Sequence, residues 1–136
     1  MTGLGATFST FPNFVVYFVL GGALTAIFVL LYAILTPQHD ITLIRAGNSA
    51  AAIAVVGALL GFEVPLASVI AHSAALIDVL AWGAVALVVQ LAGFFLARMM
   101  LPHLPQAIVD GNIAAAILLA GISLALGILT AACMAG

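Results

Sequence analysis

Charged side chains are almost absent from this sequence of 136 residues, of which 67% are hydrophobic and only 4% are charged. Soluble domains carry about 25% charged residues. A chain with so few polar groups cannot cover a surface that faces water, so a soluble globular protein is excluded. The composition predicts an integral membrane protein, whose first partner is the lipid bilayer.

Basic residues and cysteine are scarce too: lysine is missing, Arg45 and Arg98 are the two arginines, and Cys133 is the single cysteine. Two arginines cannot form the basic surface that nucleic acids require, so no nucleic-acid partner is expected. The sequence lacks a serine, histidine and acid pattern, a phosphate-binding loop and a paired-histidine motif. We therefore predict that the chain is not an enzyme and has no catalytic residues, cofactor or metal site.

Long apolar segments are abundant, and they cover approximately residues 14–35, 48–70, 79–101 and 112–134. Each is long enough for a helix that crosses about 30 Å of hydrocarbon. Pro12 and Asn13 suit the start of the first helix, and Thr36 and Pro37 suit its end. The segments are apolar on all sides, which argues against a β-barrel. The sequence predicts an all-α membrane protein with four transmembrane helices in a single domain, 1–136.

Two short segments, 38–46 and 102–110, precede the second and fourth spans and place apolar residues on one side. We interpret them as short amphipathic helices at the membrane interface. Each is followed by a Gly-Asn pair, at residues 47–48 and 111–112. Glycine can adopt the left-handed conformation that ends a helix, and asparagine can cap the next one. Each pair is therefore expected to turn the chain from the membrane surface into the membrane.

The chain contains an internal repeat. A shift of 64 residues places 47–53 on 111–117 with six identities in seven positions, and a shift of 65 places Thr25 on Gln90 and Pro37 on Pro102. The sequence therefore predicts two helix-pair repeats, about 12–72 and about 76–136. Because each repeat holds two crossings, the copies should have parallel topology, related by an axis near the membrane normal.

Small residues spaced four positions apart are typical of close helix packing in lipid. The pairs are Gly57 with Gly61, Gly121 with Ala125, Gly22 with Ala26, and Gly93 with Ala97. The first two pairs occupy equivalent places in the two repeats. Two interpretations are open: packing of helices within one chain, and a seam between protomers of a homo-oligomer.

Polar residues within the apolar segments are the candidate functional residues. Asn48 and Asn112 are either helix caps or, if the two helix starts converge, a polar site for an anion or for water. Thr25 and Gln90 lie near the middle of their helices, where an amide needs a hydrogen-bond partner. They either bond between helices or line a polar path.

Glu63 is the acidic residue farthest from a segment end, in the outer third of its helix. An ionisable group at this depth is a candidate for transport or proton binding. The alternative is structural, because the side chain can extend toward the headgroups and Pro65 nearby frees carbonyl groups that a protonated carboxyl can bond.

Several motifs resemble the YjfL-type small inner-membrane proteins, a bacterial family of unknown function. They are Thr36-Pro37, Gly47-Asn48-Ser49-Ala50-Ala51, residues 57–62 with Pro65-Leu66, Ala81-Trp82-Gly83, residues 86–91, residues 112–115 and residues 131–134. The resemblance spans nearly the whole chain and implies a bacterial inner-membrane location. It brings no activity and no functional residues, and Glu63 is not part of the pattern.

Arg45 and Arg98 fall on the same predicted side as His39 and His103. By the positive-inside rule that side is cytoplasmic, which places both termini in the periplasm. The function predicted is a homo-oligomeric structural component or a docking component for an unknown membrane or cytoplasmic partner. The alternative is a small channel or carrier for ions, protons or small solutes, with a polar path at the repeat interface.

Overall fold

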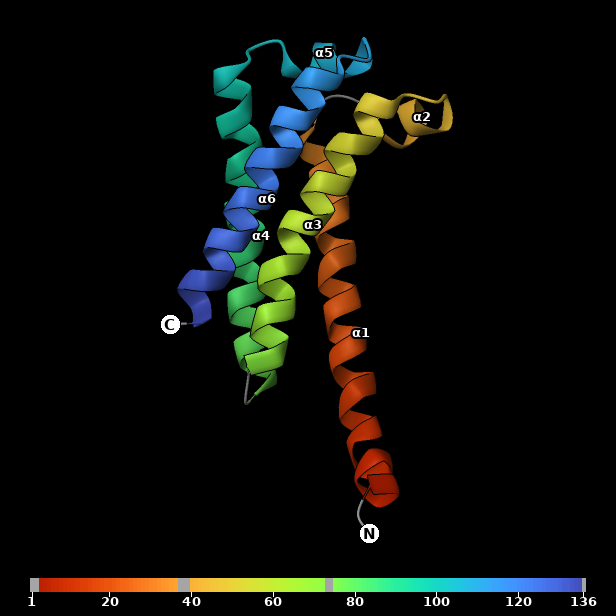
Figure 1. The fold of residues 1–136 in the computed structure, drawn as a ribbon, viewed down its shortest axis with the longest axis vertical. Coiled ribbons are helices and arrows are strands. Elements are labelled where there is room, and N and C mark those ends of the chain that lie inside the picture. Colours follow the sequence, from red (N-terminus) through yellow and green to blue (C-terminus); the bar gives the residue numbers. More distant parts are fainter. Residues whose placement is uncertain (1–2, 37–39, 73–74, 136) are drawn as a thin grey trace.

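The computed structural model describes residues 3–36, 40–72 and 75–135, and these residues form six helices. The helices are α1 (Gly3–Leu35), α2 (Asp40–Arg45), α3 (Ser49–His72), α4 (Leu76–Met100), α5 (Leu104–Val109) and α6 (Ile113–Ala135) (Figure 1). Four of them, α1, α3, α4 and α6, are long and apolar enough to cross a membrane. The prediction of an all-helical chain with four such helices is confirmed.

The start of α1 differs from the prediction. The helix begins at Gly3 and continues through Pro12, so Pro12 and Asn13 do not mark its beginning. A proline inside a helix removes one backbone hydrogen bond, a loss that membrane helices tolerate. With 33 residues, α1 is about 50 Å long at 1.5 Å per residue. Its end agrees with the prediction at Leu35, while Pro37 and His39 lie outside the described residues.

The long helices form a bundle from which the first part of α1 projects (Figure 1). Both chain ends lie toward the end of the molecule opposite α2 and α5 (Figure 1). Two corners lead from the short helices into α3 and α6. At each corner a glycine has a positive φ angle, 89° at Gly47 and 80° at Gly111. The left-handed glycines predicted from the Gly-Asn pairs are therefore present.

The closest helix packing joins α3 to α6. A Cβ atom on Gly57 would lie 2.3 Å from Ala120 Cβ, and a Cβ atom on Gly127 would lie 2.1 Å from the Gly61 carbonyl oxygen. No side chain larger than hydrogen fits at these positions, so the two backbones touch. Lipid provides little hydrophobic drive between helices, and such close contact supplies the packing energy instead.

Aromatic rings attach α1 to the rest of the bundle. Phe28 stacks on Phe62 of α3 with ring centroids 4.7 Å apart and an interplanar angle of 5°. Tyr32 meets Phe94 of α4 edge to face at 5.9 Å. All four rings are buried. The inner half of α1 is therefore held by large side chains, in contrast to the glycine contacts between α3 and α6.

Candidate functional site

Glu63 is the one Asp, Glu, Lys or Arg residue well inside the four described spans, because Asp78 and Arg98 lie in the first and last turns of α4. Glu63 stands nine residues before His72, the last residue of α3, or about 14 Å from that end. The hydroxyl of Thr25 on α1 is hydrogen-bonded to Glu63 Oε1. The same hydroxyl lies 2.9 Å from the Gly21 carbonyl oxygen. The structure thus brings together two of the predicted polar residues, and their bond joins α1 to α3.

A groove of about 520 Å³ runs between α1 and α3 at this pair. Its α1 side includes Tyr17, Gly21 and Thr25, and its α3 side includes Glu63 and Ile70. A second hollow of about 360 Å³ shares Tyr17 and Ile70 with it and reaches Asn13. We call the two together the α1–α3 groove. It extends from Glu63 toward the end of the bundle where the chain termini lie.

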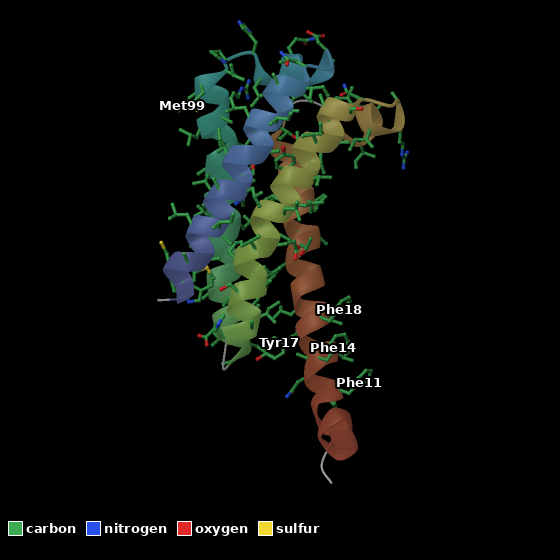
Figure 2. All side chains as sticks on the ribbon, viewed as in Figure 1. Phe11, Phe14, Tyr17, Phe18 and Met99 are labelled. Carbon is green, nitrogen blue, oxygen red and sulfur yellow. The ribbon has the colours of Figure 1, made fainter. Side chains whose placement is uncertain are left out.

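The outer part of α1 has two different sides (Figure 2). Tyr17 points toward the bundle, whereas Phe11 points away from it (Figure 2). Among the described residues that line the groove near Glu63, Tyr17 is the only other titratable side chain, and none is basic. The carboxyl group of Glu63 therefore has a hydroxyl as its partner, and no described residue that lines the groove beside it is a cation.

Gln90 forms a separate polar site at the junction of α3, α4 and α6. Its side chain is 2% exposed, and Nε2 donates to the carbonyl oxygens of Gly61 and Ser123 at 3.0 Å each. Within the described part of the chain, Oε1 is buried and has no hydrogen-bond partner. Gln90 bonds between helices here, as one of the two interpretations predicted.

The two asparagines lie at the opposite end of the bundle from the chain termini, at the starts of α3 and α6. The N–H of Ala51 donates to Asn48 Oδ1 at 3.0 Å, and the N–H of Ala115 donates to Asn112 Oδ1 at 3.2 Å. Both side chains thus have helix-capping geometry. Asn48 additionally donates through Nδ2 to the carbonyl oxygens of Ile108 at 2.9 Å and Val109 at 3.2 Å.

The five polar candidates therefore occupy three separate places. Thr25 and Glu63 form one pair, Gln90 lies at another helix junction, and Asn48 and Asn112 are at the corners. Neither asparagine lines the hollows at Glu63, at Asn13 or beside Gly121. Within residues 3–36, 40–72 and 75–135, no group of three His, Cys, Asp or Glu side chains is placed to hold a metal ion.

The small residues divide into covered and open positions. Gly57 and Gly61 face α6, and a Cβ atom on Gly93 would lie 2.6 Å from Leu126 Cδ1. By contrast, a Cβ atom on Gly121 or Gly22 would meet nothing within 4 Å. Ala125 is exposed as well. Gly57 and Gly121, which the sequence match pairs, thus have opposite surroundings, covered at Gly57 and open at Gly121.

A second groove, of about 480 Å³, lies beside Gly121 between α3 and α6. Its other lining residues include Val56 and Leu60 on α3 and Ile117 and Leu124 on α6. We call it the α3–α6 groove. It is apolar and faces outward from the bundle, so in the membrane it is open to lipid or to another helix.

The family model for a domain of unknown function, DUF350, matches residues 6–134. The chain belongs to the DUF350 family. It is 40% identical over 121 residues to the UPF0719 inner membrane protein YjfL of Escherichia coli K12, and equally to YjfL of Escherichia coli O157:H7. The alignments cover 89% of this chain and 92% of each relative. No solved structure matches the chain.

These comparisons confirm the resemblance to the YjfL-type proteins. Together with the four apolar helices, they identify this DUF350 protein as a multi-pass inner membrane protein. Neither the family description nor the name of the relatives specifies an activity.

The sequence motifs did not predict one contact surface of this DUF350 protein, the face of α6 that meets α3. Gly127 was not among the candidates, although its backbone meets Gly61. The signal was present, because Ala116, Ala120, Ser123 and Gly127 are small residues on one face of α6. That face lies on a different side of the α6 axis from Gly121 and Ala125. The sequence match pairs Gly57 and Gly61 with Gly121 and Ala125, so it did not identify Gly127.

Proposed function

We propose that this DUF350 protein is a homo-oligomeric structural or docking component of the inner membrane, in which protomers pack along α6. The observation that carries the proposal is the open face formed by Gly121 and Ala125, next to the α3–α6 groove. Small residues four positions apart permit close approach of a second helix in lipid. Gly57, the repeat counterpart of Gly121, has such a helix against it, with Ala120 in contact.

A second copy of the chain is the occupant that we propose. Around a two-fold axis, the same α6 face of each protomer meets the other, so small residues face small residues. The large apolar side chains Val56, Leu60 and Leu124 border the groove and supply the rest of the contact. A partner protein in the membrane or cytoplasm, as a docking component needs, would then bind the assembled oligomer.

We also propose that the chain consists of two helix-pair repeats and that it has a defined orientation in the membrane. The two repeats, about 12–72 and about 76–136, are supported by the matching corners at Gly47 and Gly111. We place α2 and α5 as amphipathic helices at the cytoplasmic surface, because α2 ends with Arg45 and Arg98 lies in the last turn of α4. Both termini are then periplasmic.

The experiment compares two open glycines. Gly121→Leu adds a bulky side chain to the proposed seam, and Gly22→Leu adds the same side chain at a position on α1 that is equally open. Chemical cross-linking in native membranes should give oligomers for the wild type and Gly22→Leu, and at least tenfold fewer for Gly121→Leu. A wild type that is monomeric at every expression level would contradict the proposal.

A small channel or carrier is the second candidate, and one observation favours it: the pair of Glu63 and Thr25 in a groove within the membrane. The test is flux of ions and protons into liposomes that contain the purified protein. A carrier predicts flux that Glu63→Gln abolishes. Flux equal to that of empty liposomes, or flux unchanged in both Glu63→Gln and the double variant Asn48→Ala with Asn112→Ala, would rule out this candidate.

A further inference from the structure

We propose that Glu63 and Thr25 form a proton-binding site inside the membrane, reached through the α1–α3 groove. The site would bind a proton whether or not the protein carries ions across the membrane. It is also independent of the proposed oligomer, because the open face of α6 does not contribute to it. The ligand is the proton, and the groups that bind it are a carboxyl and a hydroxyl on two different helices.

The contacts of Thr25 require more hydrogen atoms than its hydroxyl supplies. The hydroxyl of Thr25 has one hydrogen but lies beside two acceptors, Glu63 Oε1 and the Gly21 carbonyl oxygen. If that hydrogen points at Gly21, which is the usual bond of a threonine to its own helix, the contact with Glu63 needs a hydrogen from the carboxyl group. A protonated Glu63 therefore satisfies both contacts at once, whereas an ionised Glu63 satisfies only one.

The pair thus has two arrangements that differ by one proton. With the proton bound, the Glu63 carboxyl donates to Thr25 Oγ1, and the Thr25 hydroxyl donates to the Gly21 carbonyl. When the proton leaves for water at the membrane surface, the Thr25 hydroxyl turns and donates to the carboxylate, and Gly21 loses that bond. No other atom is exchanged, so the charge of the site changes by one unit.

The surroundings of Glu63 also favour its protonated form. Of the described side chains that line the groove at Glu63, Tyr17 on α1 is the only other titratable one, and no basic side chain is present. On α3 the nearest titratable residue along the chain is His72, at the end of the helix. From α4, packed on α3, the buried polar side chain is the neutral Gln90, and Asp78 and Arg98 are near the helix ends. A carboxylate without a cation is costly in lipid, and a proton removes that cost.

The groove provides access. Its hollow at Glu63 continues, through the shared Tyr17 and Ile70, into the hollow that reaches Asn13. Glu63 is about 14 Å from the end of α3 on that side. Protons would therefore exchange with the side of the membrane on which the chain termini lie.

The experiment uses the lipid-soluble reagent dicyclohexylcarbodiimide on membranes that contain the full chain. A carbodiimide reacts with a protonated carboxyl: the O–H bond and one C=N π bond break, the proton moves to that nitrogen, and the carboxyl oxygen bonds to the central carbon. An acyl shift from oxygen to nitrogen then gives a stable N-acylurea of the same mass. At 520 Å³, the hollow at Glu63 is within the size range of small-molecule sites. Peptide mass mapping should find the adduct on Glu63 at pH 7, less of it as the pH rises, and little on Asp78 or Asp110.

Three results would overturn the proposal: no adduct on Glu63 at pH 7, an adduct that does not vary with pH, or equal modification by a membrane-impermeant carbodiimide. The mapping is done on the wild type, so it does not depend on whether a variant folds. It is also separate from the liposome assay, because a labelled Glu63 without flux would support the proton site and exclude the carrier.

Thr25 has its own test. Thr25→Val removes the hydroxyl that bonds the carboxylate, and bonds to charged groups are stronger than bonds to neutral ones. Glu63 should therefore be labelled more strongly in Thr25→Val than in the wild type at the same pH. Thr25→Ser keeps the hydroxyl and should label as the wild type does, with equal elution in detergent showing that both variants fold. Labelling of Glu63 in Thr25→Val equal to that in the wild type would remove Thr25 from the site.

Discussion

The contact between α3 and α6 and the contact between α1 and the bundle use opposite means. Between α3 and α6, glycines let the backbones touch, as at Gly57 and Gly61. Between α1 and its neighbours, large rings such as Phe28 and Phe62 fill the space. The two helices also differ in burial. In the most apolar stretch of α3, 44% of the residues are buried, whereas in the most apolar stretch of α1 only 17% are buried.

This difference indicates where the molecule can adjust. A contact between two backbones leaves no room for any added atom, so the α3–α6 pair is expected to be rigid. A contact between side chains can change by rotation of a ring, and it leaves the outer half of α1 separated from α3 by the α1–α3 groove. The polar pair of Thr25 and Glu63 lies on the adjustable side of the bundle.

The largest expected effect comes from breaking the backbone contact. Gly57→Ala places a Cβ atom 2.3 Å from Ala120 Cβ and 2.4 Å from Ala120 Cα, so the helices must separate, and we expect a loss of about 3 kcal/mol in the free energy of unfolding. Gly22→Ala is the matched control, because its Cβ meets nothing within 4 Å, it lies outside the proposed seam between protomers, and alanine favours a helix by about 1 kcal/mol. Thermal unfolding in detergent should move in opposite directions for the two variants. A similar loss in both would show that the two faces do not differ.

The next largest loss of stability is expected at the two corners, where it should differ between Asn48 and Asn112. Asn48→Ala removes a helix cap and the bonds to the carbonyls of Ile108 and Val109, and should cost about 2 kcal/mol. Asn112→Ala removes only the cap at 3.2 Å and should cost about 1 kcal/mol. Unfolding titrations in mixed micelles measure both. Equal costs would show that the bonds from Asn48 to α5 add nothing to stability.

A smaller effect is expected where α1 is attached. Phe28→Leu keeps an apolar side chain but removes the stack on Phe62, at a cost of about 1 kcal/mol in the free energy of unfolding. Phe14→Leu is the control, because Phe14 is 59% exposed and should change stability by less than about 0.5 kcal/mol. The same unfolding titration applies. If Phe28→Leu destabilised as much as Gly57→Ala, the proposed contrast between the two contacts would fail.

The smallest effect is expected at Gln90. Gln90→Met keeps the size of the side chain and removes two bonds to carbonyl oxygens, each worth about 0.6 kcal/mol between membrane helices. It also removes the buried Oε1, which has no hydrogen-bond partner within the described residues. The net loss should stay below about 1 kcal/mol. A loss larger than that of Asn48→Ala would make this amide, rather than the glycines, the principal link between α3, α4 and α6.

Much of the fold could be predicted because lipid restricts the possibilities. The four spans follow from apolar length alone, and the corners at Gly47 and Gly111 follow from the chemistry of Gly-Asn. The start of α1 could not be predicted by the same rules, since Pro12 is a typical helix start and yet lies inside the helix. Propensity identifies where a helix can begin, but an apolar helix can extend through such a site.

The candidate site was predictable only in part. The residue types and depths of Thr25, Gln90 and Glu63 identified them, but their pairing depends on how each helix is rotated about its axis. The repeat even suggested Thr25 and Gln90 as counterparts, whereas Thr25 bonds Glu63 and Gln90 bonds the carbonyls of Gly61 and Ser123. Similarly, Gly57 and Gly121 match in sequence and differ in surroundings, because their helices expose different faces to each other.

The contact of Gly57 with Ala120 also has a consequence for biosynthesis. Synthesis proceeds from the N-terminus, so α1 enters the membrane first and α6 last. The helix with the smallest buried share is thus the one that must wait alone in lipid, and the tightest contact forms only after the final helix has left the ribosome. A chain truncated before α6 would present Gly57 and Gly61 as bare backbone to the bilayer.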